Sequence, residues 1–167
     1  MVTKYKLFRE NQDQREKLMK EVVELVFPDY RVDFARTRIE ITEEFKVNIN
    51  DDVDISAQGI YSLPFKFGVI DGNFICSNNN LTSMNNFPDR VNGRLECSEN
   101  DIHDTSGCTK HIEGSLYLDR NSIEQLNCYN TKVYGNFYCY QNRLIDLVGC
   151  PNKIGGQRFD FSRNNIT

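Results

Sequence analysis

The apolar residues of this chain recur at a fixed interval over most of its length. In the clearest copy, Phe74, Cys76 and Leu81 are apolar, and Asn79 stands between the last two. The same order returns every 21 residues, with a degenerate first copy from Val53 and a last copy that arrives one residue late. A period of this length predicts a solenoid in which each copy forms one turn of a coil, called a rung below.

Each copy predicts a short strand followed by a polar turn. Phe74 and Cys76 lie two residues apart, which points both side chains to the same, inward face of a strand. The Asn after the strand can bond backbone groups of its own rung and of the next one, which a tight coil would otherwise bury unpaired. These residues are Asn79, Asn100, Asn121, Asn142 and Asn164. The second half of each copy also returns to the core, at Ile70, Val91, Ile112, Val133 and Ile154.

A glycine precedes each strand. We expect the backbone there to adopt a conformation that a Cβ atom would forbid. The glycines are Gly72, Gly93, Gly114 and Gly135. One rung cannot bury its apolar edge alone, but stacked rungs share a continuous core.

The N-terminal region predicts a helix over residues 10–27. Asn11 is placed to cap this helix, with Gln14 as its capping-box partner, and Pro28 ends it. The apolar face consists of Leu18, Val22, Leu25 and Val26.

Two strand-like alternations follow the predicted helix. They run through Val32, Phe34, Ile39 and Ile41, and then through Phe45, Val47 and Ile49. Acidic pairs at 43–44 and 51–52 mark the turns. We expect residues 1–52 to form a cap, because the end of a solenoid exposes the core of its terminal rung. The helix then serves either as a cap alone or as a cap that also recruits a partner.

Composition and charge narrow the classes of function. The net charge is −4, from 20 Lys and Arg against 24 Asp and Glu. This balance argues against a nucleic-acid partner and is too mild for an acid-covered DNA mimic. The N-terminus lacks the apolar run of a secretory signal. No stretch approaches the roughly 20 apolar residues that cross a bilayer, so we expect a cytoplasmic protein with reduced thiols and no membrane partner.

The six cysteines are the unusual feature of the composition. Cys76, Cys97 and Cys139 occupy the register that Leu118 and Phe161 occupy in other rungs, which predicts a packing position. A second register holds Cys108 and Cys150 together with Phe87, and Cys128 lies one residue off it. No pair has the short spacing of a zinc site. If Cys76 and Cys97 stack in neighbouring rungs, their Cα atoms lie about 4.8 Å apart, which is within disulfide range. Formation of a disulfide in air therefore remains an alternative.

The sequence does not single out a catalytic centre. His103 and His111 fall in the return segments, with no Ser or Cys placed to use them. No pair of carboxylates is set apart for acid–base work, and no glycine-rich loop ends in Gly-Lys-Ser or Gly-Lys-Thr. We therefore expect no catalytic residue, no metal and no cofactor, and a protein that is not an enzyme.

The outward residues of the predicted strands are the better candidates for binding. Tyr117, Tyr138 and Tyr140 would form one exposed aromatic cluster, and Tyr and Arg are enriched in interface hot spots. The alternative is that Tyr is simply a favourable strand residue. The predicted partner-binding residues are Ile75, Arg94, Glu96, Tyr117, Arg120, Tyr138, Tyr140 and Asp160.

The repeat resembles the leucine-rich repeat, with its inward apolar pair, Asn and following Leu or Ile. The narrower form, with Gly before the strand and Cys inside, resembles short repeat proteins of tailed bacteriophages. It is carried by Gly-Asn-Phe-Ile-Cys-Ser-Asn-Asn-Asn-Leu at 72–81 and Val-Asp-Ile-Ser-Ala-Gln-Gly-Ile at 53–60. The resemblance covers roughly residues 38–167 and implies a phage-encoded solenoid, without bringing catalytic residues.

Together these features predict an α+β repeat fold. It is a leucine-rich-repeat-like β-solenoid of about five to six rungs over residues 53–167, with a helix and hairpin cap over 1–52. In an arc-shaped repeat protein the outward strand residues line the concave face, where partners dock. We expect a phage module that binds a host or phage protein through this face and inhibits or redirects a host protein, for example an antiviral defence factor.

Two other functions stay open at this stage. The chain stops just after Ile166, so Phe159 and Phe161 would lie in a rung with an open edge, where strands of two copies can pair. This predicts a structural protein that forms a homodimer through its C-terminal rung. The other alternative is an enzyme or nucleotide binder whose site lies in the cap or in the return loops.

Overall fold

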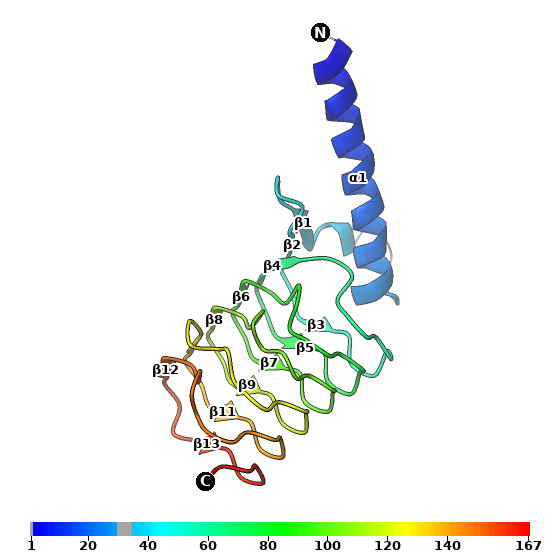
Figure 1. Cartoon of the computed structure of the whole chain (residues 1–167). Helices are drawn as coiled ribbons and strands as arrows, with labels where there is room; N and C mark the ends of the chain where they lie inside the picture. Colours follow the sequence, from blue (N-terminus) through cyan, green and yellow to red (C-terminus); the bar gives the residue numbers. More distant parts are fainter. Residues whose placement is uncertain (1, 30–34) are drawn as a thin grey trace.

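The computed structural model describes residues 2–29 and 35–167. The chain forms a β-solenoid of about five turns with one N-terminal helix. The rungs stack in chain order toward the C-terminus, while the N-terminal part of the helix projects away from the stack (Figure 1).

Two sheets run along the stack, and each regular rung contributes one short strand to each of them. The first sheet has seven strands: β1 Ile39–Ile41, β2 Val47–Ile49, β4 Phe67–Ile70, β6 Arg90–Val91, β8 His111–Ile112, β10 Lys132–Val133 and β12 Lys153–Ile154. The second sheet has six: β3 Val53–Asp54, β5 Phe74–Ile75, β7 Leu95–Glu96, β9 Leu116–Tyr117, β11 Phe137–Tyr138 and β13 Phe159–Asp160. Neighbouring strands of the regular rungs are parallel and in register.

The sequence predicts the strands of the second sheet and the hairpin of β1 and β2, but it does not predict the regular strands of the first sheet. Each of its regular strands has only two paired residues, such as Arg90 and Val91 against His111 and Ile112. Strands of the second sheet are equally short, but there a second buried residue follows the strand, as Cys97 follows Leu95 and Glu96. A regular strand of the first sheet offers only one inward residue, which appears in the sequence as a return to the core. Val91 and Ile112 are fully buried, as predicted.

The helix α1 spans Val2–Val26 and therefore begins well before the predicted start at residue 10. Asn11 is an exposed residue in the helix interior, so the predicted capping box is wrong. Residues 2–10 contain no Pro or Gly that would stop the helix earlier. The C-terminal end of α1 at Val26 agrees with the prediction that Pro28 ends the helix. The residue before a proline is biased away from helical geometry.

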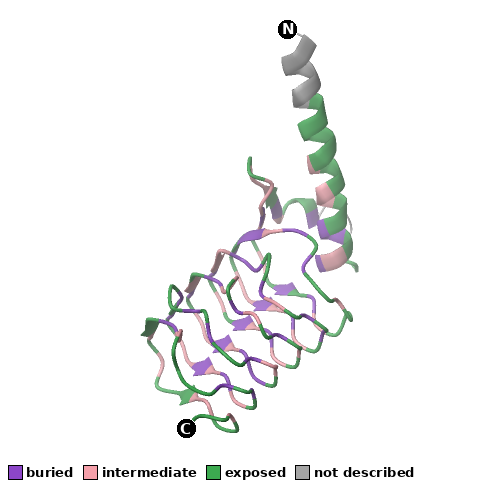
Figure 2. Cartoon of the chain, in the orientation of Figure 1, coloured by how far each residue is buried: buried purple, intermediate pink, exposed green. Residues whose placement is uncertain are grey.

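The last turns of α1 pack onto the core of the solenoid. The side chains of Val22, Val23, Val26 and Phe27 are buried in the same cluster as the first rungs. Figure 2 shows burial at this end of the helix, whereas its middle is largely exposed. Gln58 of the first rung also donates a hydrogen bond to the carbonyl oxygen of Leu25 at 3.3 Å.

The predicted hairpin is present. Strands β1 and β2 pair antiparallel, with Ile39 opposite Ile49 and Ile41 opposite Val47. Strand β4 then joins β2 in parallel, so the hairpin continues the first sheet beyond the regular rungs. Val32 and Phe34, predicted to belong to the hairpin, lie outside the described residues.

The glycines before the strands of the second sheet form a ladder through the stack. The N–H of Gly114 donates to the carbonyl oxygen of Gly93 at 2.8 Å, and the N–H of Gly135 donates to that of Gly114 at 2.9 Å. None of these glycines has a positive φ, so the predicted reason for them is wrong. The reason is close approach: a Cβ atom on Gly114 would lie 2.7 Å from the Gly93 oxygen.

The Asn residues form a second ladder, as predicted. The side-chain amide of Asn121 donates to the carbonyl oxygens of Cys97 and Leu118, both at 3.1 Å, and its Oδ1 accepts the N–H of Ile102 at 3.0 Å. Asn121 therefore bonds backbone groups of its own rung and of the preceding rung, whereas the prediction named the next rung. The residue before each Asn has φ between 52° and 57°, although none of these residues is Gly. These residues are Asn78, Glu99, Arg120, Gln141 and Arg163.

The cysteines are free thiols that pack in the core or at its margin. Cys76, Cys97, Cys128 and Cys139 are buried, and Cys108 and Cys150 are half-buried. Burial raises the pKa of the Cys97 and Cys139 thiols, and it raises that of Cys150 to about 11. These three side chains therefore stay uncharged at neutral pH, as a packing role requires.

Candidate functional site

The predicted binding residues lie on the outward side of the second sheet. Register pairs place Ile75, Glu96, Tyr117, Tyr138 and Asp160 in one row that crosses five adjacent strands. We call this row, with its neighbours Arg94, Arg120 and Tyr140, the tyrosine face.

The centre of the tyrosine face is a stacked pair of rings. The rings of Tyr117 and Tyr138 have centroids 4.8 Å apart and an interplanar angle of 11°. This separation equals the spacing of neighbouring strands, so the in-register pairing of β9 and β11 itself brings the rings face to face. The amide of Asn136 donates a hydrogen bond to the Tyr138 hydroxyl oxygen at 3.2 Å. Both residues are half-buried, so part of each side chain stays accessible.

Arg120 and Tyr140 lie beside this pair, at the end of the strands. The guanidinium of Arg120 lies 5.8 Å from the centroid of the Tyr140 ring, within cation–π range. Arg120 also donates to the carboxylate of Glu99 in the preceding rung, and this bond raises the pKa of the guanidinium.

The other predicted residues occupy the two ends of the tyrosine face. On the N-terminal side, Arg94 and Glu96 form an ion pair at 3.1 Å, and Ile75 lies one strand further away. On the C-terminal side, Asp160 of β13 lies opposite Tyr138 of β11. Its carboxylate accepts a hydrogen bond from the backbone N–H of Ser162 at 2.9 Å. Hydrogen bonds from Ser162 hold the pKa of Asp160 below its usual value. The face thus has an aromatic centre between charged ends.

Asp119 is a member of this surface that the prediction missed. Its side chain is only 5% exposed, and its carboxylate accepts hydrogen bonds from the Tyr140 N–H at 3.2 Å and the Ser98 hydroxyl at 3.4 Å. Burial raises its pKa to about 6, against the two hydrogen bonds that lower it. The signal was present, because four other rungs have Ser at this position and one has Tyr140, so Asp119 is the single carboxylate of the row.

We expect Asp119→Asn to stabilise the protein at pH 7. The pKa of Asp119 in the folded state, about 6, lies above the ordinary value of 3.8, so folding disfavours the charged form. Wild-type stability therefore falls as the pH rises from 3.8 toward 6 and stays reduced above that. The Asn variant should gain about 2 kcal/mol at pH 7 and little at pH 4. Urea unfolding of both proteins at the two pH values measures this difference, and an equal difference at both values would contradict it.

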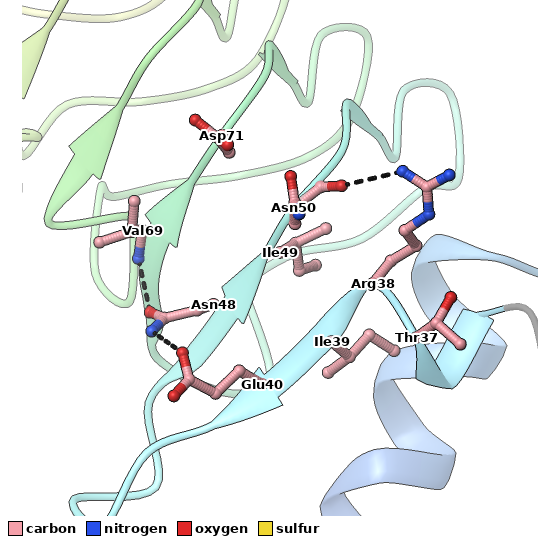
Figure 3. A pocket seen from close by; sticks show the side chains of 9 residues that line it. All are labelled: Thr37, Arg38, Ile39, Glu40, Asn48, Ile49, Asn50, Val69 and Asp71. Carbon is pink, nitrogen blue, oxygen red and sulfur yellow. Dashed lines mark hydrogen bonds between the residues drawn. The ribbon is translucent and has the colours of Figure 1, made fainter.

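The outward side of the first sheet has a hollow of about 550 Å³ next to the hairpin (Figure 3). Its polar side chains bond to one another and to backbone. Asn48 donates to Glu40 at 2.9 Å and accepts the Val69 N–H at 2.8 Å, and Arg38 donates to the Asn50 carbonyl oxygen at 3.4 Å. The bond from the Val69 N–H joins the hairpin to β4, and the other two bonds lie within the hairpin and its flanking residues, so all three have a structural role.

The described residues contain no group of three or more His, Cys, Asp and Glu side chains that could hold a metal ion. His111 bonds Glu113 at 2.9 Å, and His103 lies 3.2 Å from the Asp101 carbonyl oxygen. Within the same described ranges, no helix has the length and apolar character to span a membrane.

Comparisons with protein-family models, curated proteins and solved structures give no match to this chain. The tyrosine face therefore has to be interpreted from its own geometry.

Proposed function

We propose that this chain is a non-enzymatic, phage-encoded protein-binding module that acts in the cytoplasm of a bacterial host. It binds a host protein through the tyrosine face and inhibits or redirects it, for example a factor of antiviral defence. The observation that carries the proposal is the stacked pair of Tyr117 and Tyr138, with Arg120 and Tyr140 beside it.

The geometry of the pair suits a binding hot spot. Tyr supplies a large contact area with few rotatable bonds, so a stacked ring loses little conformational freedom when a partner covers it. The strands of the second sheet fix both rings at their Cα positions, and Asn136 restrains one hydroxyl. The charged ends, Glu96 with Arg94 and Asp160, supply the polar rim that surrounds an aromatic centre in many interfaces. A protein partner needs no cofactor, and the net charge of −4 argues against nucleic acid.

We infer that the rungs belong to a leucine-rich-repeat-like solenoid and that the helix and hairpin cap it. The Asn ladder supports the first inference, since its bonds link each rung to the preceding one. The burial of Val22, Val26 and Phe27 against the first rungs supports the second. A capped stack gives a rigid platform for the tyrosine face.

The proposal predicts which tyrosines a partner needs. Affinity capture from a bacterial host lysate should retain a specific protein with the wild type and lose most of it with Tyr117→Ala/Tyr138→Ala. The matched control is Tyr61→Ala/Tyr129→Ala, because these side chains are 72% and 67% exposed and lie outside the tyrosine face. The control should capture the same protein as the wild type. Equal capture by all three proteins would refute binding through this face.

A second candidate function is self-association through the C-terminal rung. Exposed apolar side chains occur in the last rung and in the return segment before it: Ile145, Leu147, Val148, Phe159 and Ile166. Phe159 is 49% exposed although it packs edge-on against Phe161, and β13 ends the second sheet. Sedimentation velocity at two concentrations tests this function. A dimer that dissociates in Phe159→Thr would support it, and a monomer at both concentrations would exclude it.

A further inference from the structure

A row of basic residues crosses the outward side of the first sheet. Register pairs place Arg90 opposite His111, His111 opposite Lys132, and Lys132 opposite Lys153. The row covers three strand spacings, about 14 Å. We call these four residues the basic row. It lies on a different sheet from the tyrosine face, in a chain whose net charge is negative.

The two halves of the basic row differ in their partners. Glu113 accepts from Arg90 at 2.6 Å and bonds His111 at 2.9 Å, so it balances the first half. Among the described residues, neither Lys132 nor Lys153 forms an ion pair, although the two are directly opposite each other on β10 and β12. Like charges at such positions repel, and both side chains are exposed.

One of the two lysines is held in place. The Lys153 ammonium lies 4.0 Å from the centroid of the Tyr134 ring, and the ring of His111 lies 5.0 Å from the same ring. Tyr134 therefore fixes the Lys153 ammonium at the sheet surface. The result is a pair of neighbouring cations without a carboxylate partner in the part of the chain that the structure describes, one of which, Lys153, is held in place.

We propose that the basic row binds an extended, carboxylate-rich segment of a partner protein. Side chains at alternate positions of an extended chain lie on one face, about 6.8 Å apart, so three carboxylates cover about 14 Å. That length matches the basic row, and the lysine pair supplies the charge that such a segment requires. The protein would then have two binding surfaces, one aromatic and one basic.

The surroundings of the row favour an acidic peptide over nucleic acid. Binding of single-stranded nucleic acid combines cations with aromatic rings on which bases stack. The Tyr134 ring is already in contact with Lys153 and His111. This ring is therefore not free to stack on a base, so the row lacks the aromatic platform that such binding uses.

The test uses the full chain and a fluorescein-labelled peptide of alternating Glu and Ser. Fluorescence anisotropy should show saturable binding that weakens with salt, and Lys132→Glu/Lys153→Glu should raise the Kd at least about tenfold. The control Lys17→Glu/Lys20→Glu makes the same change of net charge on exposed positions of α1 and should leave the Kd within about twofold. The milder Lys132→Gln/Lys153→Gln should weaken binding with an unchanged circular dichroism spectrum.

Two further probes complete the experiment. A peptide of alternating Gln and Ser should not bind, and a single-stranded oligonucleotide should bind more weakly than the acidic peptide. Absence of saturable binding by the acidic peptide would overturn the proposal. An equal loss in the α1 control, or tighter binding of the oligonucleotide, would overturn it as well.

Discussion

Asn142→Asp should lower the free energy of unfolding by about 3–5 kcal/mol, because it places a buried charge against two carbonyl oxygens. The Asn142 amide donates to the carbonyl oxygens of Leu118 at 2.9 Å and Cys139 at 3.3 Å, and its Oδ1 accepts the Ile123 N–H at 3.1 Å. An Asp keeps the acceptor for Ile123 but turns the donor into a second acceptor. Only 8% of the side chain is exposed, so water cannot replace the lost bonds.

Urea unfolding measures this effect against two other variants. Asn142→Ala removes the same donor without adding charge, and it leaves the Ile123 N–H buried and unpaired, so we expect a loss of about 2–3 kcal/mol. Asn80→Ala is the matched control, because Asn80 makes one exposed bond to the Gly59 carbonyl oxygen. It should cost less than about 1 kcal/mol. If Asn142→Asp cost no more than this control, the Asn ladder would not stabilise the stack.

Gly114→Ala should lower the free energy of unfolding by about 3 kcal/mol, because the new methyl group meets backbone that cannot rotate away. The Cβ atom would lie 2.7 Å from the Gly93 oxygen and 2.8 Å from the Arg94 nitrogen. The rungs would have to separate, which weakens two hydrogen bonds of the glycine ladder. The Gly114 N–H donates to the Gly93 oxygen at 2.8 Å, and the Gly135 N–H donates to the Gly114 oxygen at 2.9 Å.

The thermal unfolding midpoint checks the glycine prediction. Gln125→Ala, an exposed position in the same rung, serves as control and should change the midpoint little. An unchanged midpoint for Gly114→Ala would mean that the rungs tolerate a Cβ atom at the ladder, contrary to the close approach described above.

The repeat, the second sheet and the tyrosine face could all be predicted from the sequence. The 21-residue period fixes the register, and register alone places Tyr117 beside Tyr138. The Asn ladder was also predictable, because a buried amide repeated once per rung has to bond backbone. These features depend on spacing, which a sequence shows directly.

Other features depend on contacts that spacing does not show. Each regular strand of the first sheet has one inward residue, such as Val133, and lacks the second buried residue that marks the strands of the second sheet. The role of Gly114 depends on how near Gly93 lies, since its φ is ordinary. The left-handed residue before each Asn varies from Asn78 to Glu99 and Gln141, so its identity carries no signal. The members of the basic row are also 21 residues apart, but single basic residues do not indicate a site, and only the first sheet places them side by side.

The most direct test of the central claim is photocrosslinking in bacterial host cells. A photoreactive benzoylphenylalanine in place of Tyr138 lies at the centre of the tyrosine face, and one in place of Tyr61 lies outside it. Binding through the face predicts that the probe at position 138 crosslinks one host protein, and that the probe at position 61 does not. Absence of a crosslink at position 138, or the same products at both positions, would contradict it.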